Sequence, residues 1–187
     1  MFGWIALQTD GSATQAEPAE TRSPVADQVT PAANDLPNDF DFYAGTWKVH
    51  NRRLKLRWVN SLEWDEFPAT EVVTRVLDGL GHIDEITFPT KGFAGLTVSL
   101  FDRAKQEWSF YWVNSGEGVL FPPVVGRFEN GRGVFYGNDM DGNKPVRVRF
   151  IWSDMTANSA HWEQAFSVDG GVNWETNWTM DFTRVGP

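Results

Sequence analysis

The stretch WSFYW, residues 108–112, decides the fold class, because a bulky aromatic side chain occupies every second position. The same spacing of large apolar residues returns in VRVRFIW, residues 146–152, and in WETNWTMDF, residues 174–182. A period of two places alternate side chains on one face of a β-strand. Aromatic residues repeated on that face predict strands that enclose an apolar interior.

Strand candidates recur at short intervals, and turn residues separate them. Asp78-Gly79, Asp141-Gly142 and Asp169-Gly170 supply residues that accept the positive φ angles of tight hairpins. The strand candidates are residues 46–59, 69–77, 83–88, 96–101, 107–113, 119–128, 134–137, 146–152, 160–168 and 174–183. About ten strands without a convincing internal helix predict an all-β fold, a single antiparallel meander β-barrel, because closure removes exposed sheet edges. A two-sheet sandwich is the alternative architecture.

The first 38 residues differ in composition from the rest of the chain. They are rich in Ala, Thr, Pro, Gln and Asp, show no sustained apolar period, and carry five acidic residues against Arg22. Such a segment buries too little apolar surface to offset the entropy cost of ordering it. We expect residues 1–38 to form a flexible or loosely docked arm and residues 39–187 to form the barrel domain. Whether the arm covers the barrel as a lid stays open.

Two further segments bear on the ends of the barrel. Phe40 and Tyr43 have helical spacing, which predicts a single turn that plugs one end. Pro122-Pro123 interrupts the strand candidate at 119–128, because proline donates no hydrogen bond to a ladder. The strand then bulges or runs along an edge there, or it forms a flexible rim with Gly116 and Gly118.

Charge and composition limit the partners of the protein. A formal net charge of −9 and a pI near 4.7 disfavour nucleic acid and anionic membranes. No apolar run approaches the roughly 18 residues of a membrane helix. The chain has no cysteine, which excludes disulfides and thiolate metal sites. We expect a cytoplasmic protein that uses no cofactor and binds neither nucleic acid nor membrane, while a homodimer stays open.

The segment FYAGTW, residues 42–47, resembles the Gly-x-Trp opening of lipocalins and other calycin-like barrels. This resemblance implies that Trp47 enters the barrel floor and that Arg184, in the last strand, packs across it. More widely, the chain resembles an uncharacterised bacterial family of lipocalin-like barrels. The segments that carry this likeness are residues 45–54, 122–128 and 161–166. The family implies a barrel with a ligand cavity and does not imply a reaction.

A second likeness is local. SVDGGVNW, residues 167–174, resembles the Asp-box hairpin of sialidase propellers, where it is a turn away from the catalytic centre. The motif does not repeat in this chain, so a propeller is rejected. We interpret the segment as a hairpin without a further role.

Strand parity nominates polar residues for the interior. If Trp47 points inward, Asn51 and Arg53 share its side of the strand. A buried arginine needs a carboxylate or a bound anion, and Asp84 is the predicted counter-charge. The alternative is an Arg53 that faces solvent, since a bulge reverses parity.

The number of tryptophans predicted to face the interior suggests that the barrel holds a ligand. A buried Trp needs a partner for its N–H, whereas a plain core uses Leu, Ile and Val at lower cost. A Trp-rich interior therefore favours a planar or polyunsaturated ligand. The predicted ligand-binding residues are Asn51, Arg53, Asp84, Trp108, Phe110, Trp112, Trp162, Gln164 and Trp178. Phosphate-loop, nucleophile-elbow and dinucleotide motifs are missing, so no catalytic residue is nominated.

The histidines offer a weaker signal. His82-Ile-Asp84 with the remote His161 formally matches the ligand set of non-haem iron sites, a match that arises easily by chance, and we predict no metal. His161 and Glu163 share one strand face, opposite Trp162 and Gln164, and we expect them on the outer surface.

Together these features predict a lipocalin-like binding protein for a hydrophobic small molecule that bears a carbonyl or carboxylate group. The alternative is a cofactor-independent cyclase or isomerase that folds a polyene- or polyketide-like substrate in the same cavity, with Arg53 or Asn51 polarising a carbonyl. A haem or metal protein and a structural barrel with a filled core are the remaining hypotheses.

Overall fold

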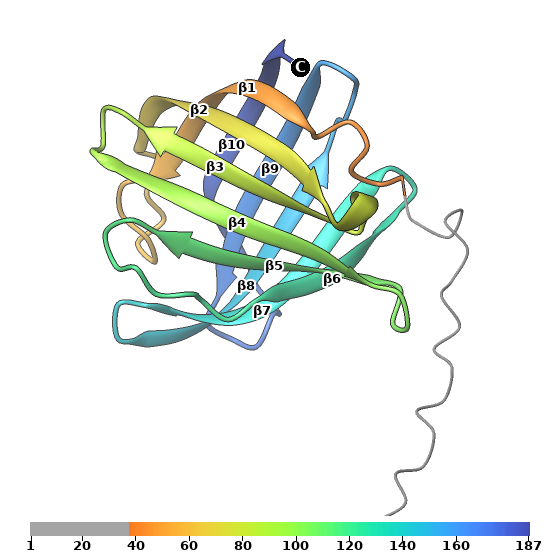
Figure 1. Cartoon of the computed structure of the whole chain (residues 1–187). Helices are drawn as coiled ribbons and strands as arrows, with labels where there is room; N and C mark the ends of the chain where they lie inside the picture. The colour runs from red at the N-terminus through yellow and green to blue at the C-terminus, as the bar shows by residue number, and fades with distance from the viewer. Residues whose placement is uncertain (1–37) are drawn as a thin grey trace, which may run out of the picture. The chain divides into compact units, whose positions relative to one another are not determined.

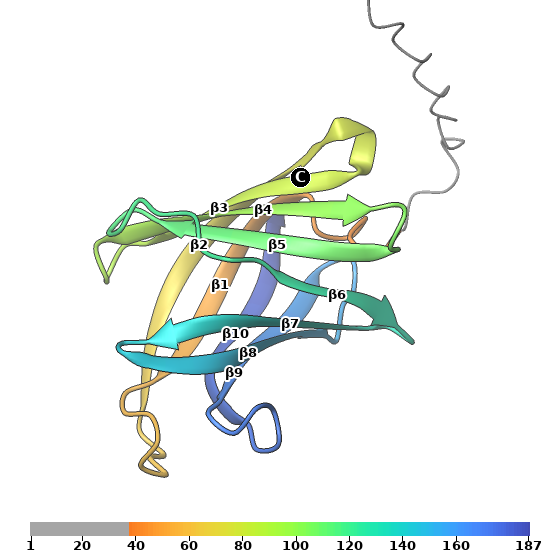
Figure 2. The same ribbon diagram turned by 90° about the horizontal axis from the view of Figure 1, so that it is seen from below.

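A computed structural model of the chain describes residues 38–187. Ten antiparallel strands form one closed barrel in the order β1-β10-β9-β8-β7-β6-β5-β4-β3-β2, so each strand pairs with its neighbours in sequence and β10 pairs with β1. Figures 1 and 2 show the strands wrapping around a common axis. The predicted meander barrel is confirmed. The predicted arm, residues 1–38, lies outside the described residues except for Asn38.

The strands are joined by short turns at one end and by turns and longer loops at the other. A 3₁₀ turn, η2, covers Leu77–Gly79 between β2 and β3. The strands are β1 Gly45–Leu54, β2 Trp64–Val76, β3 Gly81–Phe88, β4 Phe93–Asp102, β5 Glu107–Asn114, β6 Val124–Glu129, β7 Arg132–Asp141, β8 Lys144–Ser153, β9 Ser159–Ser167 and β10 Glu175–Gly186. Among residues 38–187, no helix is long and apolar enough to span a membrane.

A turn at residues 38–44, the closing turn, fills one end of the barrel, which we call the closed end. Phe40 and Tyr43 are almost completely buried there, as their spacing predicts. The Phe40 ring meets Trp108 and Phe128 edge to face, with centroids 5.1 and 4.8 Å apart. Such aromatic contacts stabilise beyond the area they bury. The closing turn therefore seals this end with apolar surface.

Trp47 and Arg184 stand at the closed end as the lipocalin resemblance implies. Trp47 is fully buried, and its indole N–H donates to the backbone oxygen of Tyr43 at 2.8 Å. The guanidinium of Arg184 lies over the Trp47 ring, 4.2 Å from its centroid, and donates to the backbone oxygens of Ala44 and Phe42. Arg184 therefore fastens the last strand to the chain that enters the first.

A β-bulge between Thr176 and Trp178 corrects the predicted parity of the last strand. Trp178 is buried in the interior, but Trp174 packs on the outer surface against Tyr136 and Arg149. One extra residue reverses the face on which all preceding side chains lie. The two-residue spacing at 174–182 therefore does not place all of its residues on one face: Trp174, before the bulge, lies outside, and Trp178, after it, lies inside.

Several strand boundaries also differ from the sequence prediction: β2 begins five residues earlier than predicted, and β7 covers Arg132–Asp141 rather than 134–137. β1 ends at Leu54, and the segment up to Val59 continues as a loop. Of the candidate at 119–128, only Val124–Glu129 forms a strand, and the segment with Pro122 and Pro123 is largely loop. β5 pairs with β6 only from Trp108 to Phe110, which leaves the rest of β5 beside that loop (Figure 2).

The Asp-box-like segment is a hairpin between β9 and β10. Asp169 accepts hydrogen bonds from the Ser167 hydroxyl at 2.7 Å and from the backbone N–H groups of Val172 and Asn173. These hydrogen bonds lower the pKa of Asp169 to about 2. The indole N–H of Trp174 donates to the backbone oxygen of Gly171 at 2.8 Å. The side chains that define the motif therefore build the turn itself.

Candidate functional site

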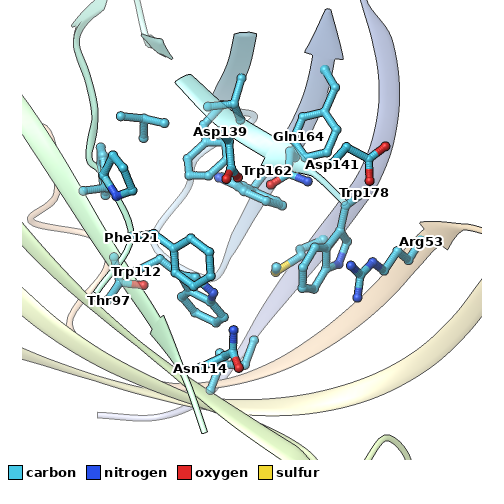
Figure 3. Close-up of a pocket in the computed structure, with 18 of the residues that line it drawn as sticks. Arg53, Thr97, Trp112, Asn114, Phe121, Asp139, Asp141, Trp162, Gln164 and Trp178 are labelled. Atoms are coloured by element: carbon cyan, nitrogen blue, oxygen red, sulfur yellow. The ribbon is translucent and has the colours of Figure 1, made fainter. Parts of the chain in front are cut away.

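The barrel holds a cavity of about 350 Å³ that opens at the end opposite the closing turn. We call this opening the mouth. Cavities of this size accommodate small organic ligands. Figure 3 shows Trp112 and Phe121 on one side of the cavity and Trp178 with Arg53 on the other. The hollow interior is therefore walled largely by aromatic rings, with polar groups at its two ends.

Seven of the nine predicted ligand-binding residues line this cavity. They are Arg53, Asp84, Phe110, Trp112, Trp162, Gln164 and Trp178. Trp108 instead belongs to the closed end, where its indole N–H donates to Asp39 at 3.1 Å. Asn51 is fully buried behind the cavity wall and accepts a hydrogen bond from the Trp178 indole at 3.0 Å. Its role in the structure is to orient Trp178.

Trp112 can lie over β4 because Gly95 is beneath it. A Cβ atom at Gly95 would stand 1.7 Å from the Trp112 ring, a distance that excludes any side chain in this arrangement. Phe121, in the loop after β5, donates its backbone N–H to the Trp112 oxygen at 2.8 Å. This hydrogen bond brings the loop over the mouth, beside the ring of Trp112.

Arg53 stands at the mouth, exposed to solvent while still lining the cavity. Its guanidinium lies 4.8 Å from the centroid of the Trp178 ring. Within residues 38–187 it forms no salt bridge or hydrogen bond, so its donors are free. The predicted partner, Asp84, is not beside it: Arg53 pairs in register with Asp65 and Trp178, whereas Asp84 pairs with Val73 and Thr97.

Two carboxyl groups, Glu71 of β2 and Asp84 of β3, meet at the inner part of the cavity. We call them the inner carboxyl pair. Register places them on diagonal positions of neighbouring strands, since Val73 pairs with Asp84 and Glu71 pairs with Ile86. Both side chains are about 3% exposed. The Tyr43 hydroxyl, which rises from the closing turn, donates to Glu71 Oε1 at 2.8 Å.

Burial sets the protonation of the inner carboxyl pair. It raises the pKa of Glu71 well above its ordinary range, and the charge of Asp84 raises it further. Burial also raises the pKa of Asp84 to about 6, although hydrogen bonds from Glu71 and Thr97 oppose that rise. Glu71 therefore holds its proton more tightly than Asp84 does.

The loop after β1 is fastened to the far side of the mouth. Arg57 donates from Nε to Asp141 at 2.9 Å, and a second guanidinium nitrogen contacts the other carboxylate oxygen. The indole N–H of Trp58 donates to the same carboxylate at 2.7 Å, and its backbone N–H donates to Glu175. The Arg57 side chain lowers the pKa of Asp141, so this carboxylate stays ionised. The loop is thus held across part of the entrance.

Apolar side chains are exposed around the mouth. They come from the loops that follow β1, β5 and β9 and from the end of β7, and each is more than half exposed: Leu56, Val59, Leu62, Val119, Leu120, Met140, Val168 and Val172. Exposed apolar groups gathered around one opening are typical of binding sites.

The formal histidine–aspartate metal set is not assembled. His82 and Asp84 point inward, while His161 lies on the outer surface, where its Nδ1 is 2.6 Å from Asp181. The expected outer position of His161 is confirmed. Within residues 38–187, no group of three side chains is arranged to hold a metal ion. Burial lowers the pKa of His82 to about 4, so this imidazole is neutral.

Glu71 is the functional candidate that the sequence did not nominate. Its strand alternates Phe67, Ala69, Glu71 and Val73 on the inner face, so a carboxyl group in an apolar series was a detectable signal. However, Val72 and Val73 put an apolar residue on each face of the strand, so the sequence alone did not show which face is the inner one. Tyr43 and Thr97 were also missed as partners, because they join the pair only through contacts distant in sequence.

The lipocalin-like architecture is supported by the closed meander and by the stack of Arg184 on Trp47. Comparison with protein-family models and with curated proteins gave no match to this chain. The specific bacterial family suggested by residues 45–54, 122–128 and 161–166 therefore stays a prediction.

Proposed function

We propose that this protein binds a small hydrophobic molecule in the barrel cavity, with a carbonyl or carboxylate group of the ligand held by Arg53 at the mouth. The aromatic-walled cavity of about 350 Å³ carries this proposal. A structural barrel would gain stability by filling such a space, because an empty cavity costs dispersion and transfer energy. The apolar side chains around the mouth support entry of a hydrophobic ligand from this end.

Arg53 is suited to the polar end of the ligand. It has unused donors in a planar fork, which matches a carboxylate or a carbonyl. The Trp178 ring beneath it restricts the guanidinium to a position beside the cavity. Arg57, in contrast, already binds Asp141 and is less available to a ligand.

Calorimetric titration with naphthylacetate tests this proposal, and naphthylethanol is its uncharged analogue. We expect both probes to bind, and Arg53→Gln to weaken naphthylacetate binding by about tenfold while changing naphthylethanol binding little. Arg52→Gln is the matched control, because Arg52 is the adjacent residue and pairs with Glu66 outside the cavity. Absence of binding by both probes contradicts a ligand cavity, and an unchanged affinity in Arg53→Gln contradicts the role of this residue.

Native mass spectrometry of protein purified from its own host provides a second measurement. A small molecule that travels with the protein is expected, and Gly95→Val should reduce its occupancy because the new side chain displaces Trp112. If the purified protein carries no ligand and also binds neither naphthyl probe, the proposed ligand-binding function is contradicted.

The inner carboxyl pair favours a second candidate function, a cofactor-independent cyclase or isomerase. An ionised Asp84 could accept a proton from a substrate while Glu71 returns one, so the pair offers a base and an acid side by side. Deuterium uptake from heavy water into carbon positions of the co-purified molecule, lost in Asp84→Asn, supports this candidate. Retention of the ligand without deuterium uptake favours binding alone.

A further inference from the structure

We propose that the inner carboxyl pair is a subsite for a protonated amine, so that the ligand carries an organic ammonium group at its inner end and a planar apolar body. This inference rests on the proposed ligand-binding function and names the chemistry of its inner end. It differs from the predicted carbonyl or carboxylate group, which belongs to the mouth and to Arg53.

The first support is a missing counter-charge. Within the described part of the chain, no Lys, Arg or His forms a salt bridge with Glu71 or Asp84. Glu71 Oε2 has no hydrogen-bond partner among these residues. Buried carboxylates are normally paired, because an unpaired interior charge is costly. The pair therefore has the charge and the acceptor atoms for a cation.

The second support is the overall charge of the cavity wall. Five carboxyl groups and only two arginines line the cavity, and one of these arginines, Arg57, is neutralised by Asp141. Asp139 and Glu117 add to the acidic side at the mouth. A cation entering this cavity meets an attractive field along its path, whereas an anion is held favourably only beside Arg53.

The third support is the aromatic wall between the two ends. Phe110, Trp152 and Phe182 line the cavity together with the inner carboxyl pair and Tyr43. The Trp152 ring is 5.0 Å from the Tyr43 ring and 5.2 Å from the Phe182 ring, so these residues form one continuous aromatic surface. Ring faces attract an ammonium group most strongly when water is excluded. Carboxylates and aromatic faces together are a typical environment for bound amines.

Arg53 is far enough from the pair to serve a different group of the ligand. Glu71 pairs with Trp47 on β1, and Arg53 lies six residues further along that strand. At the rise of a β-strand this separation is about 20 Å along the chain. A ligand amine at the inner end and a polar group at the mouth therefore do not compete for the same side chains.

Amine binding should release protons. An ammonium group next to the pair favours the ionised form of both carboxyl groups, which lowers their pKa values. The groups that face the pair are the Tyr43 hydroxyl from the closing turn and the Thr97 side chain from β4, and His82, two residues before Asp84, is neutral. Tyr43 stays protonated because burial raises its pKa. Any protons released therefore come from Glu71 and Asp84.

Titration of the full chain with naphthylethylamine and with its uncharged analogue naphthylethanol tests the subsite. At pH 8 we expect the amine to bind at least about tenfold more tightly than the alcohol, and this advantage to shrink below pH 6 as Asp84 takes up a proton. Calorimetry in buffers of different ionisation enthalpy should detect proton release with the amine and none with the alcohol. Equal affinities, or no proton release with the amine, contradict the subsite.

The double variant Glu71→Gln/Asp84→Asn removes both charges while keeping the shapes of the side chains. It should abolish the preference for the amine and leave naphthylethanol binding within about twofold. Glu85→Gln is the matched control, since Glu85 lies on the same strand but on the exposed outer face. An amine preference that survives in the double variant refutes the proposal. Absence of binding by naphthylacetate, naphthylethanol and the amine contradicts the proposed function itself, whereas alcohol binding without amine preference contradicts only the subsite.

Discussion

The closed end and the mouth of this barrel are built from the same residue type for opposite purposes. At the closed end, Trp47 is fully buried, its N–H is bonded to Tyr43, and Arg184 covers its ring. At the mouth, Trp112 is partly exposed and borders open space, and Arg53 has no protein partner for its donors within residues 38–187. Tryptophans therefore stabilise the fold where their contacts are complete, and where they are not they leave ring surface beside the cavity, which we propose to be a binding surface.

Truncation of one tryptophan at each end should give the largest difference. Trp47→Ala removes a ring that contacts Phe42, Tyr43 and Phe182, and we expect a loss of about 3–5 kcal/mol in the free energy of unfolding. Trp112→Ala enlarges an existing cavity, so its cost should stay below about 2 kcal/mol. Urea unfolding curves measure both values. Equal losses would show that the two ends do not differ in packing.

Removal of a charge from the inner carboxyl pair should change the pH dependence of stability. The pKa of Asp84 is raised on folding to about 6, so the folded protein binds this proton more tightly than the unfolded chain. The resulting stabilisation is complete below the ordinary pKa near 4 and is lost as the pH rises to about 6, by up to about 3 kcal/mol. Asp84→Asn should therefore be more stable than the native protein at pH 8 and show a smaller slope between pH 4 and 6.

Chemical unfolding at several pH values checks this difference, with Glu85→Gln as the control on the outer face of the same strand. A native protein whose stability rises from pH 4 to 6 relative to Asp84→Asn would show that Asp84 is favourably ionised in the fold. The inner carboxyl pair would then have a cation inside the protein, and the mouth would be the only site for a charged ligand.

Loss of the contact between Arg57 and Asp141 should have the smallest effect on stability. The two side chains are 25% and 12% exposed, and a partly solvated ion pair contributes about 1 kcal/mol or less. Arg57→Gln should instead speed dissociation of naphthylacetate several-fold, because the loop after β1 is no longer fastened across the entrance. Exchange spectroscopy by NMR measures this rate. A large loss of stability with an unchanged dissociation rate would make this contact part of the fold rather than of the entrance.

The barrel itself was predictable because its information is local. Large apolar side chains alternate with other residues in 108–112 and 146–152, which identifies the face of each strand that points into the barrel. Turns that contain glycine join successive strands. The closing turn with Phe40 and Tyr43 was visible for the same reason. The stack of Arg184 on Trp47 could be expected from the lipocalin resemblance, although these residues are distant in sequence.

The inner end of the cavity was not predictable in the same way. Glu71, Asp84 and Thr97 meet because of the registers of β2, β3 and β4, and register is not encoded by any one strand. The bulge before Trp178 likewise changes the face of Trp174 without a glycine or proline to announce it. The alternation of side chains along single strands therefore predicted most of the cavity wall. The grouping of Glu71, Asp84 and Thr97 at its inner end became visible only once the pairing of the strands was known.

The short pairing between β5 and β6 has a consequence for solubility. From Tyr111 to Asn114, β5 has no β6 residue in register, so this part of the barrel presents an edge strand. Such an edge can recruit a strand from another molecule and begin aggregation. The adjoining loop returns one backbone hydrogen bond through Phe121 and then places Pro122 and Pro123, which offer no N–H to an incoming chain. The doublet thus borders the cavity beside this unpaired part of β5 and offers an incoming strand no N–H groups to pair with.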